Sequence, residues 1–373
     1  MRYPSLTDGT VTLRAYTLDD LDACVETCAD PETAAWTTVP HPYTDDDGIE
    51  WITKTVPRGW SDGTSLDFAV EFERRYVGGI SLLPKEDGLA EIGFAMHPSV
   101  RGRGVCRRAI KLLVDWGFAE RDIEVAIAFT YVGNWASRRV LWANGFTFDG
   151  MVPSFLTQRG QRRDVWVSTL RATDTREPKS TWFTPPTLET PRLRLRPLLD
   201  SDADRLDEMS HDERTIHFNG LIELPGRAYG PAVLLRARER HATGQQLAWC
   251  IAARDTDLAV GKIQLFDLEG PDRTEVDCGY VMHPDARGQG YLTEALNALA
   301  DWTFLPTSSG GLGKRLITIG TAASNTASRH AATRAGFTHV ATLPSAMPTG
   351  PTTFDDEVIY HRHNPSWQPD GVS

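Results

Sequence analysis

The chain has 373 residues, 40% of them hydrophobic, and a formal net charge of -11. This length favours two domains, each large enough to bury a core. The negative charge argues against non-specific nucleic-acid binding, which needs a basic surface, and an amine-bearing or basic substrate fits it better.

Apolar runs in the chain stay shorter than the ~18 residues of a membrane span. The N-terminus lacks the basic and then apolar segments of a signal peptide. The five cysteines are odd in number and scattered through apolar contexts, which favours packed free thiols over disulfides or a metal site. We therefore expect a cytoplasmic protein that has no membrane partner and binds no metal.

The first half of the chain alternates strands with amphipathic helices. One helix is expected to begin after Asp19 and Asp20, whose carboxylates favour a helix N-terminus. Another is expected from Asp45 to about Thr55. Apolar and alternating runs predict strands at 11–14, 66–72, 76–83, 91–96, 125–131 and 165–170.

A break in hydrophobic periodicity, rich in proline, predicts a linker at 172–187. The same order of elements then restarts at 193–197 and continues through a strand at 276–282 and another at 317–322. Two domains, 1–171 and 188–373, therefore share one plan. An internal repeat of this length indicates duplication of a whole domain.

One stretch occurs in both halves: an apolar strand, His-Pro, Arg-Gly-x-Gly and then a helical pattern. The copies lie at 97–106 and 283–292. Glycine lets the backbone approach a ligand closely, and the free N–H groups and positive dipole end of a helix favour phosphate. A single copy would be weak evidence, but the duplication strengthens the prediction of an anion site in each half.

A second motif follows each glycine turn. Asn134 and Asn325 begin an Asn-x-x-Ser helix start, and each precedes a helix-ending Gly-Phe by 11 residues, counted to Gly145 and Gly336. The second half has extra residues between the turn and the asparagine. These lie at 306–311 and indicate a loop insertion.

This ordered set of motifs resembles the GNAT superfamily of acyl-CoA-dependent N-acetyltransferases, and within it the RimJ/RimL-like branch that acts on ribosomal-protein N-termini. The resemblance covers about residues 8–171 and 188–364. It implies an α/β (α+β) fold with two tandem GNAT domains, each a mixed, mostly antiparallel twisted sheet flanked by helices. It also implies acetyl-CoA as cosubstrate and no metal; for the assembly we expect a monomer or a homodimer.

The resemblance assigns residues of both halves to the acyl-CoA site. It implies that the glycine turn holds the pyrophosphate, that the preceding strand bonds the pantetheine and polarises the thioester carbonyl, and that the asparagine also bonds pantetheine. The corresponding positions are Phe94, Ala95, Met96, Arg101, Gly102, Arg103, Gly104, Val105, Cys106 and Asn134 in the first half, and Val281, Met282, Arg287, Gly288, Gln289, Gly290 and Asn325 in the second.

Four residues are candidates for catalysis. Acetyl transfer needs a neutral amine, so a carboxylate, directly or through water, takes up a proton as attack proceeds. Glu91 and Asp277 are the candidates for this role, with solvated strand carboxylates as the alternative. The resemblance gives Ser137 and Ser328 the task of protonating or hydrogen-bonding the leaving thiolate, and the alternative is that the Asn and Ser residues are ordinary helix caps.

The two halves differ around the glycine turn. The first has four arginines between residues 101 and 108, which suit a cofactor with several phosphates. The second places the branched Leu292 where the backbone is expected to approach phosphate. We therefore expect 1–171 to hold the active site and 188–364 to be weakened.

Other classes of protein fit less well or stay open. Arg107 and Thr293 replace the third glycine of a Rossmann fingerprint, and no Gly-Lys-Ser/Thr follows either turn, which excludes a P-loop. Cys106 as an acyl carrier is disfavoured. A non-catalytic acyl-CoA-binding or scaffold protein is the alternative function. For the acceptor, a protein N-terminus and a small-molecule amine both stay open.

Overall fold

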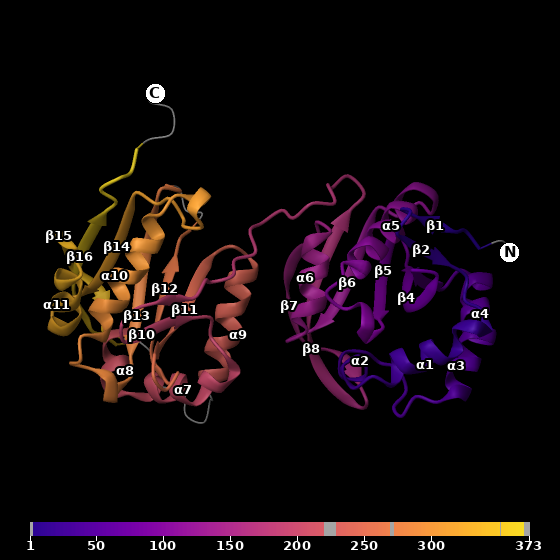
Figure 1. The fold of residues 1–373 in the computed structure, drawn as a ribbon, viewed down its shortest axis with the longest axis horizontal. Helices are drawn as coiled ribbons and strands as arrows, with labels where there is room; N and C mark the ends of the chain where they lie inside the picture. The colour runs from indigo at the N-terminus through magenta and orange to yellow at the C-terminus, as the bar shows by residue number, and fades with distance from the viewer. Residues whose placement is uncertain (1–2, 220–228, 269–271, 351, 369–373) are drawn as a thin grey trace. The chain divides into compact units, whose positions relative to one another are not determined.

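The computed structural model describes residues 3–219, 229–268, 272–350 and 352–368. The chain divides into two compact units, Met1–Lys179 and Ser180–Ser373. Each unit contains one eight-stranded sheet with helices packed on both of its faces (Figure 1). The described strands pair antiparallel except for one parallel pair in each sheet. The predicted fold class, two tandem mixed and mostly antiparallel sheets flanked by helices, is confirmed.

The sheet of the first unit has the strand order β1-β2-β3-β4-β5-β6-β8-β7. Its strands are β1 (Leu6–Thr7), β2 (Val11–Arg14), β3 (Leu66–Phe72), β4 (Arg75–Pro84), β5 (Leu89–Met96), β6 (Val125–Tyr131), β7 (Thr147–Gln158) and β8 (Gln161–Arg171). Its helices are α1 (Leu21–Ala29), α2 (Pro31–Trp36), α3 (Asp45–Glu50), α4 (Val56–Asp62), α5 (Val105–Glu120) and α6 (Trp135–Ala143).

The sheet of the second unit has the same connectivity, in the order β9-β10-β11-β12-β13-β14-β16-β15. Its strands are β9 (Leu188–Glu189), β10 (Leu193–Arg196), β11 (Gln246–Ala253), β12 (Ala259–Phe266), β13 (Glu275–Met282), β14 (Leu316–Ala322), β15 (Thr338–Pro348) and β16 (Phe354–His363). Its helices are α7 (Ala203–His211), α8 (Glu213–Asn219), α9 (Tyr229–Ala242), α10 (Tyr291–Phe304) and α11 (Thr326–Arg334).

The central strand β11 shows how each sheet is covered on both faces. Successive side chains of a strand point to opposite faces. Leu247, Trp249 and Ile251 pack into the core cluster that includes α10. Ala248 and Cys250 pack into the cluster formed by α7 and α9. Burial on both faces explains why this segment is continuously apolar in sequence.

One predicted helix boundary is wrong. The helix expected from Asp45 to about Thr55 instead continues as a π-helical turn over Trp51–Thr55 and then as α4 to Asp62. Pro57 comes directly after the π-helical turn, where the Val56 N–H bonds to the carbonyl of Trp51 five residues back, so the α-helical hydrogen-bond ladder is already interrupted where the proline lacks its N–H.

Several elements give no sequence signal and go unpredicted. The strands β7 and β15 pair with β8 and β16, yet most of their side chains are exposed. An exposed strand needs no alternation of apolar and polar residues, so hydrophobic periodicity does not reveal it. The sequence also predicts no helix at α9, although its buried face is part of the second core.

The segment predicted as a linker, 172–187, divides between the two units. The boundary between the compact units falls after residue 179. On one side Arg176 Nε donates to Asp115 of the first unit (2.8 Å). On the other, the backbone N–H of Phe183 donates to the carbonyl of His241 in the second (2.9 Å). Both halves of the segment are therefore packed against their own unit.

The pair of Arg196 and Asp202 is buried in the second unit, with side chains 9% and 4% exposed and an Nη1–Oδ2 distance of 2.9 Å. Removing one partner leaves the other charge buried without it, which typically costs about 3–5 kcal/mol. We predict that Arg196→Ala lowers the free energy of unfolding of the second unit by about this amount, measured by urea denaturation of the full chain. Arg194→Ala, whose partner Glu189 is exposed, is expected to cost less than about 1 kcal/mol. Equal losses would contradict the role of burial.

Candidate active site

The parallel strands β5 and β6 pair only near their beginnings. Residues 89–91 pair with 125–127, and Glu91 is the last paired residue of β5. On its other edge β5 continues to pair with β4 as far as Met96. In the second unit β13 and β14 separate in the same way after Asp277. Each sheet therefore opens beside a strand whose peptide groups on that edge have no partner in the neighbouring strand, and these groups are available to a ligand.

The two glycine turns have the same backbone conformation. Gly102 and Gly104 have φ values of +75° and +78°, and Gly288 and Gly290 have values of +75° and +77°. In each unit the helix begins at the residue after the second glycine. Non-glycine residues rarely adopt this region. Because the φ values of the two turns agree, Leu292, which stands where the first turn has Cys106, does not change the backbone path of the second turn.

The first arginine of each turn is tied to the protein itself. Arg101 Nη2 donates to Asp30 (2.5 Å), whose carboxylate also accepts a backbone N–H from the first turn of α2. Arg287 Nη2 binds Asp212 in the same way (2.5 Å), and that carboxylate accepts a backbone N–H of α8. The two guanidinium groups thus hold the turn against a helix, and the N–H groups in the first turn of the following helix, which have no helical partner, are donors for an anion.

Two predicted cofactor-binding side chains point elsewhere. Arg103 lies over the Phe72 ring, 4.7 Å from its centroid, and pairs with Glu73 (2.8 Å). Gln289 Nε2 donates to the carbonyl of Asp285 (2.9 Å). Neither side chain lines the groove of its unit.

The turn, the separated strand and the start of α6 form a groove in the first unit with a volume of about 590 Å³. The structure brings together here most of the first-half residues that the sequence predicts: Phe94, Ala95, Met96, Arg101, Gly102, Gly104, Val105, Cys106, Asn134 and Ser137. Sequence reasoning missed others that line the same groove: Glu32, Thr33, Trp36, Arg139 and Val140.

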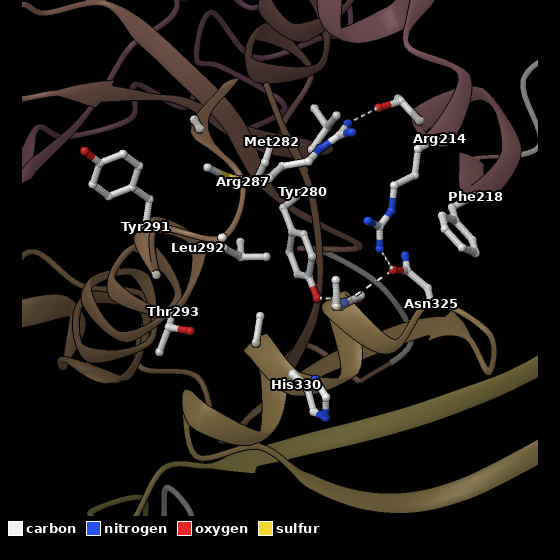
Figure 2. A pocket seen from close by; sticks show the side chains of 18 of the residues that line it. Arg214, Phe218, Tyr280, Met282, Arg287, Tyr291, Leu292, Thr293, Asn325 and His330 are labelled. Atoms are coloured by element: carbon white, nitrogen blue, oxygen red, sulfur yellow. Dashed lines mark hydrogen bonds between the residues drawn. The ribbon is translucent and has the colours of Figure 1, made fainter. Parts of the chain in front are cut away.

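The second unit has the equivalent groove, with a volume of about 410 Å³. Figure 2 shows Arg214 and Phe218 of α8 on one side of it, Tyr280 across its centre and Leu292 beside the tyrosine ring. The sequence missed Arg214, Phe218 and Tyr280. Leu292 lines the groove as well, and its expected effect on cofactor binding stays a prediction. The predicted residues that line this groove are Val281, Met282, Arg287, Gly288, Gly290, Asn325 and Ser328.

The two candidate bases lie in different surroundings. Glu91 Oε2 is 3.3 Å from Lys85 Nζ, in an ion pair of an exposed lysine and a partly buried glutamate. Burial raises the pKa of Asp277 to about 6, and a hydrogen bond with Asp267 and the negative charge of Glu357 contribute to the rise. A carboxyl group that titrates near neutral pH exchanges protons readily at working pH. Asp277 is therefore a candidate base of the second unit, although neither it nor Glu91 is among the residues that line the grooves. The expectation that the second unit is weakened stays a prediction.

The asparagines of both units cap their helices. Asn134 Oδ1 accepts the backbone N–H of Ser137 (3.1 Å), and Asn325 Oδ1 accepts that of Ser328 (3.3 Å). Each serine side chain still lines its groove. In the second unit the Tyr280 hydroxyl lies 2.8 Å from Ser328 Oγ. A tyrosine in an apolar strand usually belongs to the core, so the sequence alone gave little reason to select Tyr280.

The cysteines are all free. Burial raises the pKa of the Cys106 thiol to about 12, so the reactive thiolate is disfavoured and an acyl-carrier role with it. Among the described residues, no three His, Cys, Asp or Glu side chains gather where they would hold a metal ion. Within the same ranges, no helix combines the length and apolar character needed to cross a membrane.

The family model described as "Acetyltransferase (GNAT) domain" matches the chain twice, over residues 10–147 and 192–338. Together these matches cover well over half of the chain. Each match includes the separated strands, the glycine turn and the asparagine cap of one unit.

Individual relatives correspond in length to one unit. The uncharacterized N-acetyltransferase p20 of Bacillus licheniformis is 26% identical over 164 residues, which are 43% of this chain and 92% of p20. The uncharacterized N-acetyltransferase YoaA of Bacillus subtilis is 23% identical over 173 residues, 46% of this chain and 94% of YoaA. Less than half of this chain is thus similar to nearly the whole of each relative.

Solved structures with a similar fold include Mycobacterium smegmatis RimJ in complex with CoA-disulfide, with a TM-score of 0.42, 19% identity and coverage of 46% of this chain and 90% of that one. The ribosomal-protein-S5-alanine acetyltransferase from Vibrio fischeri has a TM-score of 0.41, 18% identity and coverage of 46% and 97%. Each again matches less than half of this chain.

The raised pKa of Asp277 determines the sign of a stability change. Between pH 3.8 and about 6 the folded chain binds this proton more tightly than the unfolded chain does. The stabilisation is therefore present at low pH and is lost as the pH rises through about 6. Because Asn stays neutral, we predict that Asp277→Asn raises Tm at about pH 7.5 and leaves it almost unchanged at about pH 4, measured by thermal unfolding.

Glu91→Gln is the matched control for that measurement. Its partner Lys85 is exposed, and exposed ion pairs contribute little to stability. We expect no comparable rise in Tm at either pH. A Tm of Asp277→Asn below that of the unmodified chain at about pH 7.5 would contradict the raised pKa.

Proposed function

Because this chain belongs to the GNAT acetyltransferase family and is an acyltransferase, we propose that it transfers an acetyl group from acetyl-CoA to a primary amine by direct attack on the thioester. One observation carries the proposal. In each unit a single groove combines a strand edge left unpaired by its neighbour, a glycine turn that begins a helix, and an asparagine-capped helix with a serine in its first turn.

Acetyl-CoA lies along this groove in the proposal. The backbone N–H groups of the glycine turn and the start of α5 or α10 hold the pyrophosphate. The peptide groups of β5 beyond Glu91, or of β13 beyond Asp277, bond the pantetheine amides as a further strand would. Volumes of about 590 and 410 Å³ lie within the range of small-molecule sites.

The reaction then needs one proton acceptor and one hydrogen-bond donor. The amine nitrogen forms a bond with the carbonyl carbon, and backbone N–H groups of the strand edge stabilise the charge that develops on the carbonyl oxygen. Glu91 or Asp277, directly or through water, takes the proton that the amine loses. The C–S bond breaks, and the hydroxyl of Ser137 or Ser328 donates a hydrogen bond to the departing thiolate.

The acceptor is a primary amine of a protein N-terminus or of a small molecule. The second unit supports an amine acceptor, since Asp267, Asp277 and Glu357 gather beside the point where β13 and β14 separate. Negative charge there attracts a protonated amine before it loses its proton. Five free thiols fit a reducing compartment such as the cytoplasm.

Both units take part in binding in this proposal, and the second has the better groups for chemistry. The turn arginines made the first unit the expected active site. Two of them are engaged away from the groove, since Arg103 stacks on Phe72 and Arg108 pairs with Asp8 (2.7 Å). The second turn keeps the same backbone in spite of Leu292.

Valine at the second glycine of either turn is expected to abolish acetyl-CoA binding in that unit. Gly104 and Gly290 lie at φ of +78° and +77°, where a β-branched residue is strained, so valine there is expected to distort the turn that holds the pyrophosphate in this proposal. Isothermal titration of the full chain should give two acetyl-CoA sites. Each of Gly104→Val and Gly290→Val should remove one site, and the double variant both.

Two glycines outside the grooves provide controls for backbone strain. Gly160, in the β7–β8 turn, and Gly310, after α10, have φ values of +78° and +80° and no atom near an added Cβ. Gly160→Val and Gly310→Val should keep both sites. A loss of sites in these variants equal to that in the turn variants would contradict the proposed cofactor position. Two sites without transfer of labelled acetyl groups to any amine in a broad panel would instead favour the non-catalytic scaffold.

A further inference from the structure

A pair of hydroxyl groups lies at the point where the second sheet opens. Tyr280 is three residues beyond Asp277, on the part of β13 that has left β14. Its hydroxyl is 2.8 Å from Ser328 Oγ in the first turn of α11. Figure 2 shows the tyrosine ring crossing the groove with its hydroxyl directed toward the start of that helix. The pair thus lies between the unpaired strand edge and the capped helix.

The same pair borders two cavities of the second unit. The first is the groove of about 410 Å³ beside the glycine turn. The second, of about 430 Å³, is lined by the separated part of β13, by β14 and by the end of β15. Phe218, Tyr280, Asn325 and Ser328 line both. A cosubstrate in the first cavity and an acceptor amine in the second would therefore meet beside these two hydroxyl groups.

Either hydroxyl of the pair is able to donate the hydrogen bond. Burial raises the pKa of Tyr280, so the phenol keeps the proton that it needs in order to donate. A serine hydroxyl has one proton and two acceptor positions. When Tyr280 donates to Ser328 Oγ, the serine proton is free for another acceptor and is polarised by the bond that the oxygen accepts.

The first unit lacks this pair. Phe94 and Tyr280 occupy the same register of their sheets, opposite Ile80 of β4 and Ile263 of β12. Phe94 lines the first groove together with Ser137, but it has no hydroxyl. The two units therefore share a backbone while only the second provides a donor to its serine from this position.

We propose that Tyr280 is a positioning residue that holds the Ser328 hydroxyl toward the leaving sulfur, and that the second unit is for this reason the faster acetyltransferase. This inference rests on the proposed function. As the amine nitrogen bonds to the carbonyl carbon, the C–S bond breaks and its electron pair leaves on sulfur. Ser328 donates a hydrogen bond to this thiolate, and Asp277 takes the proton that the amine loses.

The test uses the full chain with Gly104→Val, so that turnover reports on the second unit. Tyr280→Phe, Ser328→Ala and the double variant are compared for kcat, KM and the Kd of acetyl-CoA. The acceptors are a peptide with a free α-amine and a diamine, with acetyl-CoA hydrolysis measured where neither reacts. We expect Tyr280→Phe to lower kcat roughly tenfold while KM and Kd stay within about twofold, and the double variant to be no slower than Ser328→Ala.

Tyr360→Phe is the matched control. Tyr360 is a buried tyrosine of the same unit whose hydroxyl accepts a hydrogen bond from Arg329 (3.2 Å) and which lines neither cavity. It should keep kcat. In the reverse direction, Phe94→Tyr in the Gly290→Val chain should raise the kcat of the first unit.

Three results would overturn the inference. The kcat of Tyr280→Phe could stay within about twofold of that of the Gly104→Val chain, or Tyr280→Phe could change KM alone. In the third, the losses in kcat from Tyr280→Phe and Ser328→Ala multiply in the double variant. Absence of turnover in the Gly104→Val chain while Gly290→Val remains active would overturn it too. These outcomes differ from failure of the proposed function, in which the unmodified chain itself transfers no acetyl group.

Discussion

The site in each unit depends on the separation of two parallel strands. Pairing between β5 and β6 ends at Glu91, and pairing between β13 and β14 ends at Asp277. A sheet interior normally satisfies every peptide group. Here one edge of a central strand is left without its neighbour. That opening makes room for a ligand, provides it with backbone donors and acceptors, and places a carboxylate at the last paired position.

The surrounding elements keep this opening in shape. The ion pairs of Arg101 with Asp30 and of Arg287 with Asp212 hold each glycine turn against a short helix. The glycines of the turn permit the left-handed backbone conformation that it needs. The asparagine caps fix the start of α6 and α11, so each serine lies on the groove. These devices recur in both units, which is why the grooves agree in outline although their side chains have diverged.

Divergence between the units concerns chemistry more than architecture. At equivalent places the first unit has Phe94 and Glu91, which pairs with Lys85, whereas the second has Tyr280 and Asp277, whose pKa is raised. Burial raises the pKa of Asp277 to about 6, and the other carboxylates near the opening of the second sheet add to the rise. The number of arginines near the turn favours the first unit as the active site. That number says nothing about burial, and burial shifts the pKa of a carboxyl or hydroxyl group.

Local sequence by itself determined the features that have a local physical cause. Three such features were visible in the sequence: the glycines at 102, 104, 288 and 290, the asparagines at helix starts, and the apolar periodicity of buried strands. Each shapes the backbone within a few residues of itself. The duplicated fold and the outline of both grooves were therefore predictable. The tertiary structure decided three other features: the direction of the Arg101 side chain, the exposed strands β7 and β15, and the hydrogen bond between Tyr280 and Ser328. Tyr280 and Ser328 are 48 residues apart, and only the packing of α11 against the opened sheet brings their hydroxyls within hydrogen-bonding distance.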